Sequence, residues 1–395
     1  MTRRGPDIVV AGAGVVGAAT ALGLARAGLR VTVVEAREAA PWTAAAPPDL
    51  RVYAIAPASA DLFAALGLWP RIVAARAQPY REMRVWDAGA AGELHFRASD
   101  AGGTSLGHIV EQGLLQHVLW QALQHEPNAE FRCPARVAAV LEDEDGVAVE
   151  LDDGSRLRAQ LLVAADGADS PVRAASGIEV AERDYAQRGV VGFVRSERPH
   201  ADTAWQRFQP GGPLALLPFA DGLASIVWTL PTAEAERVLA LDDAAFGDAV
   251  TRAFDGRLGA LRTASPRAAF PLRLRLAERY VQGRVVLVGD AAHVVHPLAG
   301  QGVNLGLADA AELVALLRGA RDAGRPLGAP TLLRRYERSR RSANTLAAYT
   351  FDALERLFGS DAVVPTLLRG PSLALVDRVA PLRRFFLRHA SGRAG

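Results

Sequence analysis

The sequence contains no lysine and only one cysteine among its 395 residues. Its positive charge is carried by arginine and nearly balances the carboxylates, with a formal net charge of +2 at pH 7. A charge so close to neutrality gives no indication of nucleic-acid binding. Because Cys133 is the single cysteine, an internal disulfide and a cysteine-cluster metal site are both excluded, and a reducing compartment is favoured.

Long hydrophobic runs are also missing, although half of the residues are hydrophobic. No uninterrupted apolar stretch is long enough to span a bilayer. An arginine pair at 3–4, followed by an apolar run, has the look of an export signal. Three glycines interrupt that run, however, and a second apolar run follows at Val31–Val34. A strand, a turn, a helix and a second strand explain all of these features, so we expect a mature chain that faces the cytoplasm.

The interrupted run has the pattern of a dinucleotide-binding βαβ unit. A predicted strand, Asp7–Ala11, leads into a loop with glycines at Gly12, Gly14 and Gly17. The first would make the tight turn, the second would let the backbone approach a pyrophosphate, and the third would let helix and strand pack closely. Glu35 ends the next strand at the spacing expected of an acid that binds an adenosine ribose. The pattern predicts a dinucleotide site; the alternative is a βαβ unit without a ligand.

A second glycine loop lies near the other end of the chain. An apolar strand, Val285–Val288, stops at a Gly-Asp pair, and a bend closed by Pro297 leads to Gly300 and Gly302 before an amphipathic helix. Glycines there allow another molecule to come close, and the free N–H groups at a helix start can hold an electron-rich group. Asp290, at the end of the strand, could hold a sugar hydroxyl.

A third turn repeats this pattern in the middle of the chain. The predicted strand Leu157–Val163 is followed by Asp166-Gly167, and a Ser-Pro pair then begins a helix. The acidic run at 142–145 resembles a metal site only superficially, and the tip of a solvated hairpin explains it better. No metal site is therefore predicted.

Other side chains have two interpretations each. Arg51 could face a phosphate or lie on a solvated surface, and Ser59 could cap a helix that runs to Leu66. Isolated strands with aromatic and turn residues between 177 and 275 predict a separate mixed sheet that could cover a pocket. Phe219 and Trp228 would then form apolar walls, or they are ordinary core residues.

The sequence resembles the ubiquinone-biosynthesis aromatic hydroxylases, a branch of the single-component FAD monooxygenases that are built like p-hydroxybenzoate hydroxylase. The resemblance covers essentially the whole chain. Beyond the glycine loops and the acidic turns, it rests on Arg51-Val-Tyr-Ala-Ile-Ala, His108-Ile-Val-Glu, Gln206-Arg-Phe, Gly212-Pro-Leu-Ala-Leu-Leu-Pro, Ser225-Ile-Val-Trp-Thr-Leu-Pro and Tyr336-Glu-Arg-Ser-Arg-Arg.

The resemblance implies the fold and its division into domains. We expect an α/β fold with a Rossmann-like FAD-binding domain, an inserted mixed β-sheet substrate domain and a C-terminal helical segment. The expected ranges are 1–75 with 100–180 and 275–340 for the FAD-binding domain, 76–99 with 181–274 for the substrate domain, and 341–395 for the helical segment.

The resemblance also implies which residues hold FAD. They are Gly12, Gly14, Gly17, Glu35, Arg51, Gln112, Asp166, Gly167, Asp290, Gly300, Gly302, Val303 and Asn304. The first three would hold the pyrophosphate and Glu35 the adenosine ribose. Arg51 and Gln112 would approach the phosphates or the ribityl chain, and Asp290 would bind the ribityl side. Asp166 would serve both FAD and the passing NAD(P)H, while Gly302, Val303 and Asn304 would meet the isoalloxazine edge.

The implied activity is the hydroxylation of a polyprenylated phenol in ubiquinone biosynthesis. NAD(P)H would reduce the flavin, and O2 would form a C4a-hydroperoxyflavin whose distal oxygen is transferred to the ring. The protein must exclude water from the pocket. Tyr53 and His296 are candidates for a base that deprotonates the phenol, and Pro297, Phe219 and Trp228 are further pocket candidates. No catalytic residue is assigned.

The expected partners follow from such a substrate. The segment Leu373–Arg388 mixes arginines with bulky apolar residues, which suits an anionic membrane surface. It could instead pack on the body of the protein or on a twin subunit in a homodimer. We expect a cytoplasmic protein, with contact to the inner face of the cytoplasmic membrane and to a ubiquinone-biosynthesis complex as further expectations.

Two alternatives stay open. One is a related flavin hydroxylase or epoxidase that acts on another lipid or polyketide. The other is a subunit that binds FAD but mainly organises a biosynthetic complex.

Overall fold

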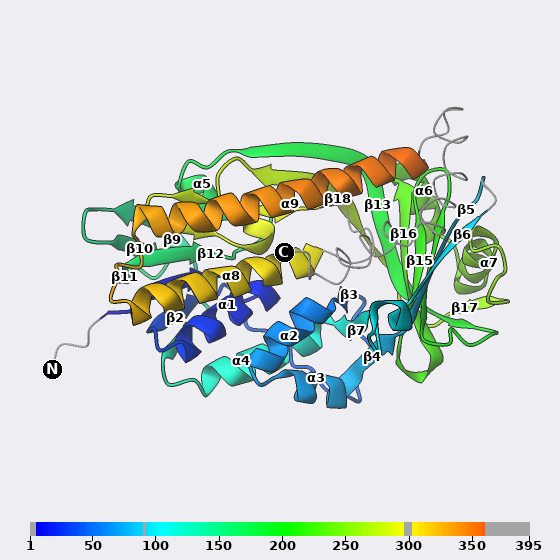
Figure 1. Ribbon diagram of the computed structural model, residues 1–395. Coiled ribbons are helices and arrows are strands. Elements are labelled where there is room, and N and C mark those ends of the chain that lie inside the picture. Colours follow the sequence, from blue (N-terminus) through cyan, green and yellow to red (C-terminus); the bar gives the residue numbers. More distant parts are fainter. Residues whose placement is uncertain (1–4, 90–91, 296–301, 360–395) are drawn as a thin grey trace.

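The computed structural model describes residues 5–89, 92–295 and 302–359, and two large sheets dominate it (Figure 1). A six-stranded sheet and a nine-stranded sheet lie at opposite ends of the view, and the strand β13 (Val180–Ser196) runs between the two regions alongside β18 (Ala268–Ala277). The glycine loop of 12–17 and the turns of Asp166 and Asp290 follow strands of the six-stranded sheet.

The six-stranded sheet has the strand order β19-β20-β12-β1-β2-β8. Its strands are β1 (Ile8–Ala11), β2 (Val31–Val34), β8 (Ala129–Arg132), β12 (Leu161–Ala164), β19 (Val281–Gln282) and β20 (Val285–Leu287). β1 pairs in parallel with β2 and β12, and every residue of these three strands is buried. Near-continuous apolar runs are typical of parallel strands that are covered on both faces.

Helices cover one face of this sheet and a small antiparallel sheet covers the other. The antiparallel sheet consists of β9 (Val137–Glu142), β10 (Val147–Leu151) and β11 (Arg156–Ala159). The helices of the chain are α1 (Val15–Arg26), α2 (Pro57–Ala65), α3 (Trp69–Arg76), α4 (Gln112–Gln124), α5 (Pro171–Ala175), α6 (Thr232–Leu239), α7 (Asp243–Ala253), α8 (Gly302–Asp322) and α9 (Pro330–Gly359). α8 packs on α1, and α9 packs on α8 and extends toward the nine-stranded sheet (Figure 1).

The nine-stranded sheet has the order β21-β18-β13-β16-β15-β14-β5-β6, and β17 pairs with β13 at its side. The strands not yet given are β5 (Glu82–Asp87), β6 (Glu93–Arg97), β14 (Thr203–Phe208), β15 (Leu214–Pro218), β16 (Leu223–Pro231), β17 (Leu261–Thr263) and β21 (His293–Val294). β5 pairs in parallel with β14 and the other pairs are antiparallel, so the sheet is mixed, as expected. α6 and α7 cover one face.

A third, smaller sheet lies between the two large ones. It has the order β3-β7-β4, with β3 (Val52–Ile55), β4 (Ala77–Tyr80) and β7 (Gly107–Glu111). Ala54 of β3 and Ile109 of β7 share a hydrophobic cluster with Phe193, Leu217 and Phe219 of the nine-stranded sheet region. The cluster therefore joins the three-stranded sheet to one face of the nine-stranded sheet.

Two local expectations were wrong. The predicted strand Leu157–Val163 is two strands, β11 and β12, which belong to different sheets and are separated at Gln160. Ser59 does not cap α2, because Pro57 occupies the first turn and Ala56 is the N-cap residue. α9 runs without a break across residue 340, and the domain boundaries themselves stay a prediction.

Within 5–89, 92–295 and 302–359, no single helix is long and apolar enough to cross a bilayer. α2 and α3 meet that length and composition only when they are counted together, and they meet at a bend of 118°.

Candidate functional site

Four turns meet at the carboxyl-terminal edge of the six-stranded sheet. Short backbone hydrogen bonds hold neighbouring turns together: Gly12 N–H donates to Val34 (2.8 Å), Ala165 N–H to Ala11 (2.7 Å), and Val288 N–H to Ala164 (3.0 Å). In open α/β sheets, ligands bind outside the carboxyl ends of the strands. This edge is therefore the place where a cofactor is expected.

The three glycines of the first loop have different surroundings. Gly12 has φ of +96°, and a Cβ atom there would lie 2.3 Å from the carbonyl oxygen of Ala165. A Cβ atom on Gly17 would lie 2.1 Å from the carbonyl oxygen of Gly12. Around Gly14, no described atom lies within 4 Å of the Cβ position. Packing of the protein itself thus requires the first and third glycines, while the second faces open space.

Ala13, inside that loop, is held from two sides. Its N–H donates to Glu35 Oε2 at 2.6 Å. Its carbonyl accepts from Trp120 Nε1 at 2.7 Å and from Gln116 Nε2 at 3.2 Å. Glu35 therefore lies at the loop, as the spacing predicted, whereas the two donors from α4 were not found from the sequence. They lie more than a hundred residues away and belong to no local motif.

Asp166 has one satisfied and one unsatisfied oxygen. Its Oδ2 accepts from the N–H of Val172 at 3.1 Å, while its Oδ1 is buried without a hydrogen-bond partner among the described residues. Burial raises the pKa of this carboxyl group, although Ser170 and the Val172 N–H act in the opposite direction. A buried acceptor without a donor is costly unless a ligand or water supplies one.

Arg173 ties this turn to the turn of Asp290. Its guanidinium donates to the carbonyl oxygens of Ala291 and Ala168, both at 2.9 Å. Burial and the nearby Arg275 lower the pKa of Arg173. Sequence reasoning missed this residue, because an arginine on a short helix carries no motif of its own.

Asp290 presents an accessible carboxylate in a crowded region. Asp290 is exposed to solvent on one side. The many protein atoms around its carboxyl group raise the pKa of that group, and the nearby His293 and Arg51 act in the opposite direction. The preceding Gly289 has φ of +60°, and Val16 of α1 lies 3.1 Å from its Cβ position. The packing of Val16 therefore sets the spacing between the glycine loop and the Asp290 turn.

Arg51, Tyr53 and Gln112 form a small polar group at the junction of β3 and α4. The Tyr53 hydroxyl donates to Gln112 Oε1 at 2.9 Å, and Arg51 Nη1 donates to the same oxygen at 3.1 Å. Burial raises the pKa of Tyr53 to about 12. A phenol with that pKa is protonated at neutral pH, so Tyr53 is suited to donate a hydrogen bond and unsuited to act as a base.

The start of α8 combines an open position with a fixed one. No described atom lies within 4 Å of the Cβ position of Gly302, and Val303 is buried beside it. The Asn304 side chain accepts from the Ala56 N–H (2.9 Å) and from Ser59 Oγ (2.8 Å), and it donates to the Ala54 carbonyl (2.8 Å).

The side chain of Asn304 thus anchors α8 to β3 and α2, and Ser59 serves this bond instead of capping a helix. The side chains of Val303 and Asn304 are buried, so the open space at this helix start lies beside the backbone of Gly302. Three predicted residues of the preceding bend, His296, Pro297 and Gly300, lie outside the described residues.

The two aromatic pocket candidates lie on different faces of the nine-stranded sheet. Phe219 packs against Phe193, with ring centroids 5.0 Å apart, in the cluster that faces β3 and β7. Trp228 packs with Trp86 on the face that α6 and α7 cover. The structure therefore does not bring them together, and of the two only Phe219 lies on the face toward β3 and β7.

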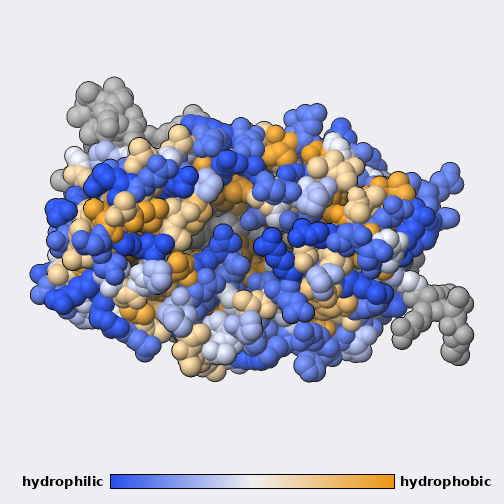
Figure 2. Space-filling view, turned by 180° about the vertical axis from the view of Figure 1, so that it is seen from behind, coloured by the Kyte–Doolittle hydropathy of each residue, from blue (hydrophilic) through white to orange (hydrophobic). Residues whose placement is uncertain are grey.

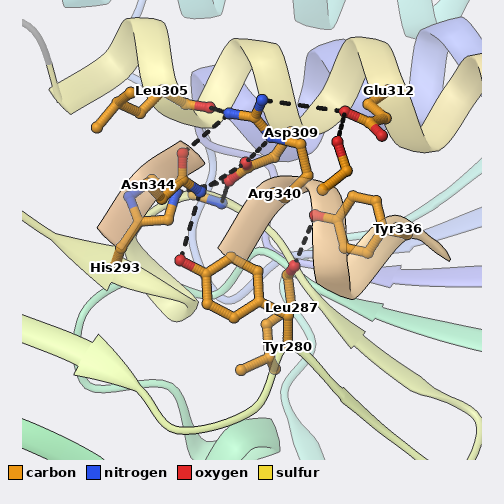
Figure 3. Close-up of polar contacts among 11 residues, drawn as sticks. Tyr280, Leu287, His293, Leu305, Asp309, Glu312, Tyr336, Arg340 and Asn344 are labelled. Atoms are coloured by element: carbon orange, nitrogen blue, oxygen red, sulfur yellow. Dashed lines mark hydrogen bonds and ion pairs between the residues drawn. The ribbon is translucent and has the colours of Figure 1, made fainter. Parts of the chain in front are cut away.

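Asp309 of α8 is the centre of a buried polar cluster with His293, Arg340 and Asn344 (Figure 3), and the cluster contacts the Gly289 backbone beside Asp290. Asp309 Oδ2 accepts from the Gly289 N–H (3.1 Å) and pairs with His293 Nε2 (2.6 Å). Asp309 Oδ1 accepts from Arg340 Nε (2.7 Å) and Asn344 Nδ2 (2.9 Å). Burial raises the pKa of Asp309, but His293 and Arg340 outweigh it and hold the pKa below the ordinary value.

These features together fit a ligand with hydroxyl groups and a diphosphate. Gly14 and Gly302 leave space at two helix starts, Asp290 offers an accessible carboxylate, and Asp166 has a buried oxygen in need of a donor. Helix starts favour anionic groups, and carboxylates accept from sugar hydroxyls. Figure 2, which views the molecule from behind, shows the surface hollowed near its centre. FAD has the required groups.

Comparisons with known proteins agree with this chemistry. A family model described as an FAD binding domain matches residues 6–348. The chain is 38% identical over 392 residues to the 3-demethoxyubiquinol 3-hydroxylase of Escherichia coli K12, which covers 99% of this chain and 100% of that protein. It is 40% identical over 386 residues to the ubiquinone hydroxylase UbiL of Rhodospirillum rubrum, which covers 98% and 89% of the two chains.

A solved structure supports the fold. The p-nitrophenol 4-monooxygenase PnpA from Pseudomonas putida DLL-E4 superposes with a TM-score of 0.80 at 23% identity, over 99% of this chain and 98% of that one. At this identity the likeness concerns the fold alone. The predicted resemblance, the fold class and the FAD cofactor are confirmed. The chain belongs to the FAD-binding monooxygenase family, in the branch of the ubiquinone-biosynthesis hydroxylases.

Proposed function

We propose that this chain hydroxylates the aromatic ring of a polyprenylated phenol in ubiquinone biosynthesis, with FAD as cofactor and NAD(P)H and O2 as co-substrates. The observation that carries the proposal is the similarity to a 3-demethoxyubiquinol 3-hydroxylase over essentially the full length of both chains. Similarity of that extent includes both the six-stranded sheet with its glycine loops and the nine-stranded sheet. The position of the ring carbon that is oxidised is left to experiment.

The FAD-binding residues are proposed from the geometry of the sheet edge. The N–H groups at the start of α1, beside the open Gly14, would hold the pyrophosphate, and Glu35 would accept from the adenosine ribose. The carboxylate of Asp290 would accept from the ribityl chain. The backbone at Gly302 and Val303 would meet the isoalloxazine edge, where the positive end of the α8 dipole favours negative charge.

Arg51, Gln112 and Asp166 would complete this site. Arg51 keeps further N–H donors for a phosphate or ribityl oxygen, because only one of them is committed to Gln112. Asp166, with Gly167 beside it, has a buried oxygen that a hydroxyl of FAD or NAD(P)H would satisfy. Gly167 has φ of +90° and no described atom near its Cβ position, so the turn is open on that side.

FAD held at this edge would supply the redox chemistry, in which NAD(P)H is the reductant and O2 the source of the oxygen atom for the ring. The residues of the chain then have two tasks, to orient the phenol and to keep water out. The cluster of Phe193, Leu217 and Phe219 closes the space between β3 and the nine-stranded sheet with apolar groups. The Tyr53 hydroxyl donates to Gln112 Oε1 and would keep that side chain in place, and burial raises the pKa of Tyr53, which favours the protonated phenol.

The substrate also determines where the protein would work. A polyprenylated phenol partitions into a lipid bilayer, so we place the chain in the cytoplasm, at the inner face of the cytoplasmic membrane. The arginine-rich segment Leu373–Arg388, the proposed membrane contact, lies outside the described residues. Contacts with other proteins of ubiquinone biosynthesis and a homodimer stay predictions.

Turnover with a phenol of defined chain length tests the proposal. The purified, FAD-loaded protein is mixed with NADH or NADPH and a short-chain polyprenyl phenol in detergent, and the product is analysed by mass spectrometry. We expect substrate-stimulated NAD(P)H oxidation and a product heavier by one oxygen atom, which carries 18O when 18O2 is supplied. Absence of turnover with each available quinone precursor would favour the scaffold alternative, and turnover restricted to other lipids or polyketides would favour the alternative hydroxylase or epoxidase.

A further inference from the structure

Asp309 lies on α8 with its carboxylate fully buried beside Arg340 and Asn344 (Figure 3), and its Oδ2 accepts from the Gly289 N–H. It accepts four hydrogen bonds, two on each oxygen. The donors come from three parts of the chain: the Gly289 backbone, His293 of β21, and Arg340 and Asn344 of α9. One side chain therefore connects the turn below Asp290 to the long C-terminal helix.

The hydrogen-bond pattern requires a deprotonated carboxylate. A carboxylate accepts on both oxygens, whereas an amide of the same shape accepts on one and donates on the other. The charge of Asp309 is balanced by Arg340, whose Nη2 also donates to Asn344 Oδ1 at 2.9 Å. A buried charge that is paired and fully hydrogen-bonded can persist, while one that has lost its partners is strongly destabilising.

The Asp309 carboxylate also determines the state of His293. Its Oδ2 lies 2.6 Å from His293 Nε2, so a neutral imidazole carries its proton on that nitrogen. His293 Nδ1 is then an acceptor, and it is buried without a partner among the described residues. His293 is almost fully buried and stacks on Tyr280, with ring centroids 6.1 Å apart. The bond to Asp309 thus fixes both the ring and its tautomer three residues after Asp290.

We propose that Asp309 is a positioning residue of the flavin site: its carboxylate fixes the Gly289 peptide and His293, and thereby the direction in which Asp290 presents its carboxyl group to FAD. The inference rests on the proposed role of Asp290 in FAD binding. Gly289 has φ of +60°, a conformation that glycine adopts easily and also leaves easily. The hydrogen bond from its N–H to Asp309 therefore restrains the turn, together with the bond from Arg173 to the Ala291 carbonyl.

The alternative is that Asp309 only fastens α9 to α8. Glu312 separates the two roles, because it lies about one helical turn further along α8 and also faces Arg340, at 4.0 Å. Glu312 accepts from Ser339 Oγ at 2.9 Å but makes no described contact with Gly289 or His293. Glu312→Gln is therefore the matched control for Asp309→Asn.

The test is an FAD titration of the refolded or flavin-stripped full-length variants, with the melting temperature measured in parallel. We expect Asp309→Asn to weaken FAD binding by about tenfold or more, in the range that loss of a supporting hydrogen bond behind a ligating group produces. Glu312→Gln should bind FAD as the wild type does. Asp290→Asn and the double variant Asp290→Asn/Asp309→Asn complete a cycle, in which the double variant should be scarcely weaker than Asp290→Asn alone.

Each contrary result has its own meaning. If Asp309→Asn lowers the melting temperature but keeps the wild-type FAD affinity, or if the two losses add, the positioning role is overturned. If Asp290→Asn keeps the wild-type affinity, the proposed site fails instead. Should Asp309→Asn not fold, His293→Phe removes the imidazole donor to Asp309 Oδ2 and keeps a ring at that position. Unchanged FAD affinity in that variant, in a folded protein, would also overturn the proposal.

Discussion

The two large sheets of this protein place their functional groups in opposite ways. In the six-stranded sheet, the central strands β1, β2 and β12 are buried and apolar apart from Thr32, and the turns that carry Glu35, Asp166 and Asp290 lie side by side at one edge. In the nine-stranded sheet, alternate side chains enter two apolar clusters, one on each face. The six-stranded sheet thus places its polar groups in the turns at one edge, while the nine-stranded sheet contributes apolar side chains on both faces.

This difference predicts that mutations in the two sheets will have separable effects. A change at the edge of the six-stranded sheet can abolish FAD binding in a folded protein. A change in the core of the nine-stranded sheet can destabilise the protein and leave FAD affinity as it was. The experiments below test this separation, beginning with the largest expected effect.

The two neighbouring glycines of the first loop separate packing from ligand approach. Gly12→Val would place atoms within 2.3 Å of the Ala165 backbone at φ of +96°, and we expect it to cost more than about 4 kcal/mol and prevent folding. Gly14→Ala meets no described atom within 4 Å, and Gly14 has φ of −63°, so the protein should fold normally. FAD affinity, measured by flavin fluorescence, should nevertheless fall by about tenfold, or roughly 1.4 kcal/mol. Wild-type affinity in Gly14→Ala would contradict the proposed approach of the pyrophosphate.

Phe219→Ala tests the core of the nine-stranded sheet. Phe219 is 1% exposed and packs on Phe193, so truncation should lower the free energy of unfolding by about 3–5 kcal/mol. Urea denaturation measures the loss, and the FAD affinity of the folded protein should not change. A large fall in FAD affinity would mean that the two sheets are not separable, while loss of coupling between NAD(P)H oxidation and hydroxylation would place Phe219 at the substrate.

Asp166→Asn should stabilise the FAD-free protein while it weakens FAD binding. Burial raises the pKa of Asp166, so the folded state disfavours the carboxylate. The pKa of Asp166 is about 3.9 in the unfolded chain and higher in the folded protein. The free energy of unfolding therefore falls as the pH rises through these two pKa values, and it stays lower at pH 7. The amide carries no charge and removes the cost of burying one, although it keeps a polar atom at the place of Oδ1, and we expect a gain of roughly 1 kcal/mol at pH 7.

The control for Asp166→Asn is the pH itself. Urea denaturation of the two FAD-free proteins at pH 7 and near pH 4 should show a difference that shrinks at the lower pH. A variant that is less stable than the wild type at pH 7 would show that Asp166 is stabilised as a carboxylate.

Trp228→Phe should have the smallest effect. Trp228 lies under α6 and α7, and its Nε1 is buried without a partner among the described residues. The loss of an unsatisfied donor offsets part of the lost packing, so the free energy of unfolding should change by less than about 1.5 kcal/mol. Thermal denaturation and an FAD titration measure both effects. Altered product or altered FAD affinity would contradict the placement of Trp228 on the far face.

The sequence predicted the edge of the six-stranded sheet because each of its turns is a local pattern. Gly12 to Gly17, Asp166-Gly167 and Gly289-Asp290 each follow an apolar strand, and parallel strands bring such turns together. It could not predict Asp309 or Arg173, whose bonds join segments that are far apart in the chain.

Two other failures have equally specific causes. The chain passes from β11 to β12 at Gln160, whose N–H donates to the Asp7 carbonyl at 2.9 Å, and no glycine or proline marks the break. Phe219 and Trp228 could not be assigned to faces, because the face of a strand residue depends on its register.

The most direct test of the central claim is a crystal structure of the protein with FAD bound. We predict that the pyrophosphate lies at the start of α1 beside Gly14, and that the carboxylate of Asp290 accepts from a ribityl hydroxyl. FAD bound away from the carboxyl-terminal edge of the six-stranded sheet, or with its ribityl chain out of reach of Asp290, would contradict the claim.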